Sequence, residues 1–308
     1  MSLCEEPKTT SGEHQYLLYM EKIMEQPERI TRNSNTVKSL FNVNLVFNNI
    51  ATAFPLLTTK KMYWKGICEE LFWFINGSTD AKILAATGVH IWDANSSRSE
   101  LDKLGHINRE EGDCGPIYGF QWRHFGATYI DCHTDYTGQG FDQLQNCIDI
   151  LKKDPYSRRC LMTGLNPSVY DDVVLPPCHV TYQFYVSDTD VTEKHILNCF
   201  MYQRSGDMFL GVPFNIASTA LLTSIIANHV GMMPGSIAIT IVDAHIYSDH
   251  YDAVEEQLKR VPYELPTLTI ATDDSITNSV NNINNYTSKD LILSNYKCYS
   301  AIKAPMST

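Results

Sequence analysis

The chain has 308 residues, of which 44% are hydrophobic and 19% are charged, and its formal net charge is -11. These proportions are ordinary for a globular protein with one large core or two smaller ones. The acidic balance excludes a general nucleic-acid binder, which would present a basic face, so we expect no nucleic-acid partner. The longest apolar run, residues 214–230, is interrupted by Asn215, Thr219 and His229 among other polar residues. It therefore predicts a buried helix and not a membrane span.

The nine cysteines follow no regular spacing and include no Cys-x-x-Cys pair. This pattern favours neither a zinc ribbon nor a thioredoxin-type site, and we expect no metal. The first residues, Met-Ser-Leu-Cys-Glu-Glu, lack the apolar core of a signal peptide. A reducing compartment is therefore expected, which means the cytoplasm or, alternatively, the nucleus.

Residues 1–13 are polar and predict a flexible N-terminal segment, whereas residues 14–308 show no break in composition and are expected to form one domain. A first helix is expected over residues 14–26. The strand after it is predicted by alternating apolar side chains, which are Phe41, Val43, Leu45 and Phe47.

Residues 64–75 predict the next helix, because their apolar side chains recur at helical spacing and Asn76-Gly77 supplies a typical stop. Glu70 lies inside this helix, one position from the inward-facing Leu71. Burying a carboxylate there is costly unless the group has a function. Glu70 is therefore a candidate site residue.

The second half of the chain predicts further strands and helices in turn. The stretch 115–126, rich in glycine and aromatic residues, is expected to be the wall of a pocket and not a regular element. A helix ending at Asp154-Pro155, strands over 160–164, 180–186, 196–202 and 237–241, the buried apolar helix and a last helix before Pro262 are expected after it. Residues 272–295, rich in Asn, Ser and Thr, are expected to be a surface excursion.

The stretch Leu175-Pro-Pro-Cys-His179 places a thiol at the mouth of a strand. Two prolines end whatever precedes them and fix the backbone approach to Cys178. Cys178 can there meet a ligand, which makes it a candidate nucleophile. The alternative is a small buried hydrophobe, which is the commoner role of a lone cysteine.

Four arginines are candidates for binding a phosphate ester: Arg32 in a polar loop, the pair Arg158-Arg159, and Arg204 beside Ser205. A guanidinium presents a planar fork of donors that fits phosphate oxygens. For any one of them, ordinary surface solvation is the alternative. A guanidinium close to Cys178 would also lower the pKa of that thiol.

Asn215 lies at the start of the apolar helix, where its amide must find hydrogen-bond partners. A planar heterocycle with a carbonyl beside an N–H, such as uracil, would pair with this amide in a cyclic pattern. A helix N-cap is the alternative. His245 and Tyr247 stand at a strand end, where they could bond a sugar hydroxyl or form a satisfied core pair.

Long, ordered motifs run through the chain and cover roughly residues 14–308. They are Phe54-Pro-Leu-Leu-Thr-Thr-Lys, Trp73-Phe-Ile-Asn-Gly-Ser-Thr, Ile91-Trp-Asp-Ala-Asn, Gly115-Pro-Ile-Tyr-Gly-Phe-Gln-Trp-Arg-His-Phe-Gly, Leu175-Pro-Pro-Cys-His, Gln203-Arg-Ser-Gly-Asp, Leu210-Gly-Val-Pro-Phe-Asn-Ile-Ala-Ser and Asp243-Ala-His-Ile-Tyr. By these motifs the sequence closely resembles the thymidylate synthase family. No dihydrofolate reductase portion precedes them, so the monofunctional form is expected.

The resemblance implies an α/β (α+β) fold, with a single domain built on a large bent mixed sheet with flanking helices. It also implies an obligate homodimer that packs sheet-to-sheet. The activity it implies is reductive methylation of dUMP to dTMP, in which 5,10-methylenetetrahydrofolate gives the carbon and the hydride and leaves as dihydrofolate. Cys178 would add to C6 of the uracil and so turn C5 into a carbon nucleophile.

By position in the family's motifs, the resemblance implies three sets of site residues and no metal. The catalytic set is Cys178, Glu70, Tyr118, His179, Arg204 and Asn215. The dUMP set is Arg32, Arg204, Ser205, Asp207, Asn215, His245 and Tyr247, completed by Arg158 and Arg159 from the other subunit. The folate set is Ile91, Trp92, Asn95, Asp207, Leu210, Gly211, Phe214 and Met306. Glu70 would organise proton transfers, a role that suits a partly desolvated carboxyl with a raised pKa.

The chain departs from the family pattern in the loop after Arg32, which lacks glycines, and in the tail 302–308, so closure over ligands is expected to differ. Two alternative functions remain open. A dUMP hydroxymethylase of the same fold would add water where the synthase adds hydride, but the large ring of Trp92 argues against admitting water. A catalytically inactive binding relative is disfavoured by the joint presence of Cys178, Glu70, Arg204 and Asn215.

Overall fold

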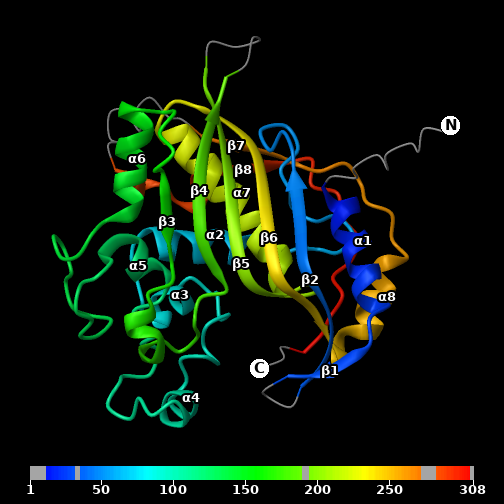
Figure 1. The fold of residues 1–308 in the computed structure, drawn as a ribbon, viewed down its shortest axis with the longest axis horizontal. Coiled ribbons are helices and arrows are strands. Elements are labelled where there is room, and N and C mark those ends of the chain that lie inside the picture. Colours follow the sequence, from blue (N-terminus) through cyan, green and yellow to red (C-terminus); the bar gives the residue numbers. More distant parts are fainter. Residues whose placement is uncertain (1–11, 32–34, 189–193, 272–281, 306–308) are drawn as a thin grey trace.

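The computed structural model describes residues 12–31, 35–188, 194–271 and 282–305. Its centre is a six-stranded mixed sheet in the order β1-β2-β6-β5-β4-β3, and β7 and β8 form a separate pair (Figure 1). Neighbouring strands of the large sheet are antiparallel except β5 and β6, which run parallel. The strands are β1 (Glu28–Ile30), β2 (Thr36–Phe47), β3 (Leu161–Thr163), β4 (His179–Ser187), β5 (Ile196–Asp207), β6 (Met233–Tyr247), β7 (Thr267–Ile270) and β8 (Leu291–Ser294).

The helices flank this sheet. They are α1 (Glu13–Met24), α2 (Trp64–Ile75), α3 (Ala81–Ala86), α4 (Arg98–Lys103), α5 (Tyr118–His124), α6 (Gln143–Lys153), α7 (Gly211–His229) and α8 (Tyr251–Leu258), with short 3-10 turns at Pro167–Asp172, Ser248–His250, Ile283–Asn285 and Ser288–Asp290. Of these, α1, α2, α6, α7 and α8 lie where the sequence predicts helices. In the part of the chain that the structure describes, no helix has both the length and the apolar character needed to cross a membrane.

One face of the sheet is covered by α7. This helix packs on β5 and β6 and also contacts α2, and Figure 1 shows both helices behind the strands. Ile237, Ile239 and Ile241 of β6 are all buried, as their alternation predicts. Because α7 lies between the sheet and α2, it is apolar on almost all sides, which confirms the prediction of a buried helix.

The opposite face of the sheet carries no helix of the described residues, and in Figure 1 it faces the viewer. On β4, Tyr182 and Phe184 are buried against the core, whereas Tyr185 is 67% exposed. On β5, Met201 is buried and its neighbour Phe200 is 42% exposed. A broad sheet face with exposed aromatic side chains is typical of an interaction surface.

Three expectations need correction. Residues 115–126 contain the regular helix α5, which packs tightly on α2: a Cβ at Gly119 would lie 2.8 Å from Phe74 O. Phe41 is 79% exposed, because Asn42 takes a φ of 61° and breaks the alternation of β2. The described part of 272–295 is no surface excursion, since β8 pairs with β7 and both Ile283 and Leu291 are buried.

Candidate active site at the entrance to β4

Cys178 lies directly ahead of β4 and is half-buried. Its backbone N–H donates to Tyr118 Oη at 2.8 Å, and its carbonyl accepts from the backbone N–H of Arg204 at 2.9 Å. The pairing of β4 with β5 shifts register between His179 and Thr181, and such bulges re-aim side chains. The thiol is therefore fixed in position through its own backbone while remaining outside the packed core.

The two prolines that precede Cys178 also anchor a guanidinium. Arg204 Nε donates to Pro177 O at 2.8 Å and Nη2 donates to Pro176 O at 2.7 Å. The same Nη2 lies 3.6 Å from Cys178 Sγ. The guanidinium of Arg204 and the thiol of Cys178 thus lie side by side, as the sequence suggests.

The Arg204 guanidinium acts to lower the pKa of the Cys178 thiol, as expected, but burial has the larger effect. Burial raises the pKa of Cys178, and the Arg204 guanidinium only opposes this rise. Desolvation disfavours the thiolate more than one neighbouring charge favours it. Ionisation of Cys178 therefore needs help beyond Arg204.

Glu70, on α2, has the raised pKa expected of a desolvated carboxyl. Burial raises the pKa of Glu70 to about 7, although the hydrogen bond from Trp92 opposes the rise. In that bond Trp92 Nε1 donates to Glu70 Oε1 at 2.7 Å. Near neutral pH both protonation states of the carboxyl are populated, so it can accept and release protons.

An aromatic cluster separates this carboxyl from the thiol. The ring centroids of Trp92 and Tyr118 are 6.2 Å apart, and Tyr118 stacks on His179 at 4.2 Å. His179 Nδ1 is hydrogen-bonded to Tyr182 Oη at 2.8 Å. Because burial lowers the pKa of His179 to about 3, its imidazole is neutral at physiological pH.

Asn215 lies within the first turns of α7 and is not the N-cap, which is Leu210. Its Oδ1 accepts from Gln203 Nε2 at 3.0 Å, and the same Nε2 donates to Ser205 O at 2.9 Å. Gln203 is buried, and its Oε1 has no hydrogen-bond partner among the described residues. The amides of Asn215 and Gln203 hold each other in place, and Gln203 Oε1 is left as a spare acceptor. This arrangement favours contact with a ligand over a role for Asn215 as a helix N-cap.

Gln203 was not singled out from the sequence. Its signal was its place as the first residue of the Gln203-Arg-Ser-Gly-Asp motif, on the buried side of β5.

The other residues expected to contact dUMP lie where β5 and β6 end. The parallel register pairs Ser205 with Asp243 and Asp207 with His245. His245 is buried and packs edge-to-face on Tyr247, with ring centroids 5.0 Å apart. Ser205, Asp207, His245 and Tyr247 are thus neighbours on two adjacent strands, as a shared ligand would require.

Arg158 and Arg159 are exposed and precede β3. Since Leu161 pairs with Gln183 on β4, the two arginines lie at least five residues along the strand from Cys178, which is about 16 Å. The structure therefore does not bring this pair to the thiol of the same chain.

The expected folate residues come from two segments. Ile91, Trp92 and Asn95 lie in the turn between α3 and α4, and Leu210, Gly211 and Phe214 lie at the start of α7. Trp92 is buried, and Ile91, Leu210 and Phe214 pack partly buried against the core. They offer apolar surface of the kind that lines ligand pockets. Arg32 and Met306 lie outside the described residues.

Lys60 was missed at the sequence level and is buried beside the start of α7. Its Nζ donates to Phe209 O and lies 3.7 Å from the centroid of the Phe209 ring. Burial lowers the pKa of Lys60 to about 7, against the opposing charges of Asp207 and Glu13. The available signal was the lysine that ends the motif Phe54-Pro-Leu-Leu-Thr-Thr-Lys.

Comparison with known proteins identifies the family. The family model for thymidylate synthase matches residues 14–308. The chain is 49% identical to the thymidylate synthase of Candida albicans over 310 residues, which covers 96% of this chain and 98% of that protein. It is 48% identical to the thymidylate synthase of Herpesvirus ateles, with 96% and 98% covered, and 47% identical to that of Homo sapiens, with 98% and 92% covered. By sequence along nearly its whole length, the chain belongs to the thymidylate synthase family.

Proposed function

We propose that this chain is a methyltransferase that converts dUMP to dTMP by reductive methylation, with 5,10-methylenetetrahydrofolate as the second substrate. The observation that carries the proposal is the pairing of Cys178 Sγ with Arg204 Nη2 at 3.6 Å. A half-buried thiol next to a fixed guanidinium is an arrangement for a nucleophile. A merely structural cysteine has no need of it.

In this reaction Cys178 acts as the nucleophile. Its thiolate adds to C6 of the uracil, and the ring electrons move toward C5 and the adjacent carbonyl. Because a thiolate is also a good leaving group, the addition is reversible. Since burial raises the pKa of Cys178 in the chain alone, ionisation is coupled to the binding of dUMP beside Arg204.

Glu70 handles protons at the base. With a pKa of about 7, its carboxyl can take up the proton lost from C5 and give it back to water at little cost. The N–H of Trp92 orients the carboxyl through its bond to Oε1. Neutral His179 and Tyr118 complete the wall between this carboxyl and the thiol.

Side-chain amides recognise the uracil. Asn215 offers its NH₂ to the C4 carbonyl and a second lone pair of Oδ1 to N3–H, while Gln203 holds the amide in this orientation. His245 and Tyr247 contact the ribose. Arg204 and Ser205 bind the phosphate on this subunit, and Arg32 is proposed to join them.

The folate site is proposed at Ile91, Trp92, Asn95, Asp207, Leu210, Gly211, Phe214 and Met306. When bound, the folate supplies the one-carbon unit and the hydride. The apolar side chains at the start of α7 and the buried ring of Trp92 suit a planar ligand and exclude water from it. This exclusion is why a hydroxymethylase, which must admit water, is not favoured.

The proposal extends to a homodimer built through the uncovered sheet face. Tyr185 and Phe200 are 67% and 42% exposed on that face, and a second copy of the sheet would bury them. Arg158 and Arg159, too far along the sheet to serve their own Cys178, would then reach the phosphate site of the partner. The cytoplasm is the proposed location.

Turnover with dUMP and methylenetetrahydrofolate, followed through dihydrofolate absorbance, tests the activity. The nucleotide product is then weighed by mass spectrometry: a methyl group supports the proposal and a hydroxymethyl group contradicts it. Incubation with 5-fluoro-dUMP and the folate should give a stable covalent complex that maps to Cys178. Absence of both turnover and adduct would indicate an inactive relative.

Mixing subunits tests the dimer. Cys178→Ser chains and Arg158→Ala/Arg159→Ala chains should each turn over poorly alone, whereas a refolded mixture should regain activity because one site of each hybrid is complete. As the control, mixing Cys178→Ser with Glu70→Gln chains should regain none, since both changes fall in the part of the site supplied by one chain. Equal results from the two mixtures would contradict shared sites.

A further inference from the structure

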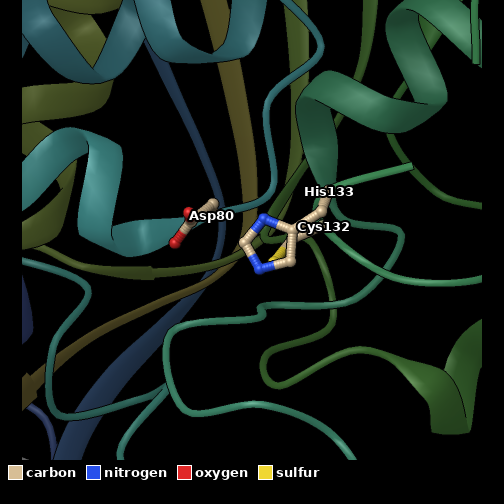
Figure 2. A group of neighbouring side chains, drawn as sticks. All are labelled: Asp80, Cys132 and His133. Carbon is tan, nitrogen blue, oxygen red and sulfur yellow. The ribbon is translucent and has the colours of Figure 1, made fainter. Parts of the chain in front are cut away.

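A second cluster of ligand-type side chains lies away from β4. Cys132 and His133 follow α5, and Asp80 is the N-cap of α3. One ligand atom from each of Asp80, Cys132 and His133 lies within 4.8 Å of the others, and Figure 2 shows the three side chains side by side. None of the residues expected to act on dUMP or the folate belongs to this cluster.

The spacing of the sulfur and the imidazole suits a shared metal ion. Cys132 Sγ and His133 Nε2 are 3.7 Å apart. In a tetrahedral zinc site, with Zn–S near 2.3 Å and Zn–N near 2.0–2.1 Å, the sulfur and nitrogen ligands are about 3.6 Å apart. The two side chains therefore need little movement to bind one ion.

Carboxylates surround this pair and make the site favourable for a cation. Asp80 and Asp113 are both buried, and Asp113 Oδ2 accepts from the backbone N–H of Cys132 at 3.2 Å. Glu110 Oε2 lies 2.9 Å from His133 Nε2. An ion at this nitrogen would replace the proton that now joins the two groups, which makes Glu110 a candidate for the fourth position.

Two cations also lie nearby, and the guanidinium of Arg109 donates to the backbone carbonyl of Asp172 at 2.6 Å. Lys82 Nζ pairs with Glu110 Oε1, and Arg109 Nε is 4.0 Å from Asp113 Oδ1. Asp80 Oδ1 accepts a hydrogen bond from the backbone N–H of Lys82 at 2.9 Å. A cavity of about 490 Å³ is lined in part by Glu110, Asp113 and His133 and so borders the imidazole side of the cluster.

We propose that Asp80, Cys132 and His133 bind one divalent transition-metal ion of the zinc type, with Glu110 or a water as fourth ligand. A thiolate with an imidazole selects zinc or cobalt over magnesium or calcium, which prefer oxygen ligands. Such an ion ties the start of α3 to the loop after α5. Its role is structural and separate from the reaction proposed at Cys178.

Cobalt(II) titration of the purified full-length chain tests this site. Wild type should bind about one Co²⁺ and show thiolate-to-cobalt charge-transfer absorption with the visible bands of a tetrahedral ion. Cys132→Ser should lose the charge-transfer band. His133→Ala, at an exposed side chain and so harmless to folding, should weaken binding at least about tenfold. Cys298→Ser, at another half-buried cysteine, should leave the spectrum unchanged.

A second readout separates a site in the folded chain from incidental thiol binding. Zinc should raise Tm by about 2 °C or more at 100-fold above its dissociation constant, because the ion binds only the folded site. The rise should disappear in His133→Ala. An absent thiolate band in wild type, or a band that persists in Cys132→Ser, would overturn the proposal. Neither result bears on the proposed dUMP activity. Turnover of Cys132→Ser is expected to equal that of wild type, so the two proposals can fail separately.

Discussion

The chain contains two Cys-His dipeptides, Cys178-His179 and Cys132-His133, and their surroundings are opposite in charge. Beside Cys178 the nearest charge is the guanidinium of Arg204, which pulls the thiol pKa down against burial. Beside Cys132 burial and then the carboxylates of Asp113 and Asp80 raise the thiol pKa to about 12. The charge beside Cys178 favours an anion, and the charges beside Cys132 favour a cation.

The histidines differ in the same way. His179 is buried and neutral, with a pKa lowered to about 3. His133 is exposed, and its hydrogen bond to Glu110 raises its pKa. The same two residue types therefore support a nucleophile in one place and a metal ligand set in the other, because the neighbours supplied by the fold decide the chemistry.

Replacing each of the two cysteines separately by serine should give the largest difference in turnover. Cys178→Ser should lower turnover at least about 10³-fold, because a serine hydroxyl is not ionised at neutral pH and adds poorly to C6. Cys132→Ser should leave turnover at the wild-type level. Steady-state dihydrofolate absorbance measures both, and dUMP titration should show that Cys178→Ser still binds. Equal losses in the two variants would erase the proposed distinction.

Glu70→Gln should lower turnover by about 10²–10³-fold, since the amide cannot exchange protons. The wild-type pH profile of kcat should bend near pH 7, where burial has placed the pKa of Glu70. In Glu70→Gln that bend should be gone. A bend that remains in the variant would assign the titration to another group.

The same variant should be more stable than wild type at high pH. The pKa of Glu70 is about 7 in the fold and 4.5 in the unfolded chain, so the folded state binds the extra proton and stability falls as pH rises between these values. Glu70→Gln should therefore gain up to about 3 kcal/mol at pH 8 and much less at pH 5. Urea unfolding at the two pH values measures the difference, and a gain independent of pH would contradict a buried ionisable carboxyl.

Hydrophobic spacing predicted most elements, because α2, α6 and β4 each bury a regular set of side chains and α7 is a continuous apolar run. It failed where local rules are overridden. Gly119 reads as a turn residue, yet it is needed for the close approach of α5 to Phe74. Phe41 reads as core, yet the positive φ of Asn42 turns it out.

The sequence predicted the site residues that belong to recognisable motifs, but it did not predict the contacts between distant segments. The prolines marked Cys178, and the register of β5 with β6 then placed Asp207 beside His245. The hydrogen bond from Trp92 to Glu70 joins residues 22 apart and has no local signal. The approach of Asp80 to Cys132 has no local signal in the sequence either, because these residues lie on separate segments that come together only in the fold.

Arg204→Lys tests whether charge alone prepares Cys178. Lysine keeps the charge but cannot span both proline carbonyls and the sulfur, so turnover should fall about 10²-fold and alkylation of Cys178 should need higher pH. Arg260→Lys is the matched control, because Arg260 also bridges two backbone carbonyls, those of Thr59 and Ser300. It should alter stability without shifting the alkylation profile.

Tyr118→Phe gives the smallest expected effect. It removes the oxygen that accepts the Cys178 N–H, a hydrogen bond worth about 0.5–1.5 kcal/mol. Because this bond positions the thiol and does not take part in the bond changes, kcat should fall roughly tenfold with little change in KM. Tyr296→Phe is matched, since Tyr296 Oη likewise accepts a backbone N–H, that of Met62, at 3.0 Å. A comparable loss of stability in both variants, with loss of kcat in Tyr118→Phe alone, separates positioning of Cys178 from general packing; equal kcat in the two would show that the backbone of Cys178 is held well enough without Tyr118.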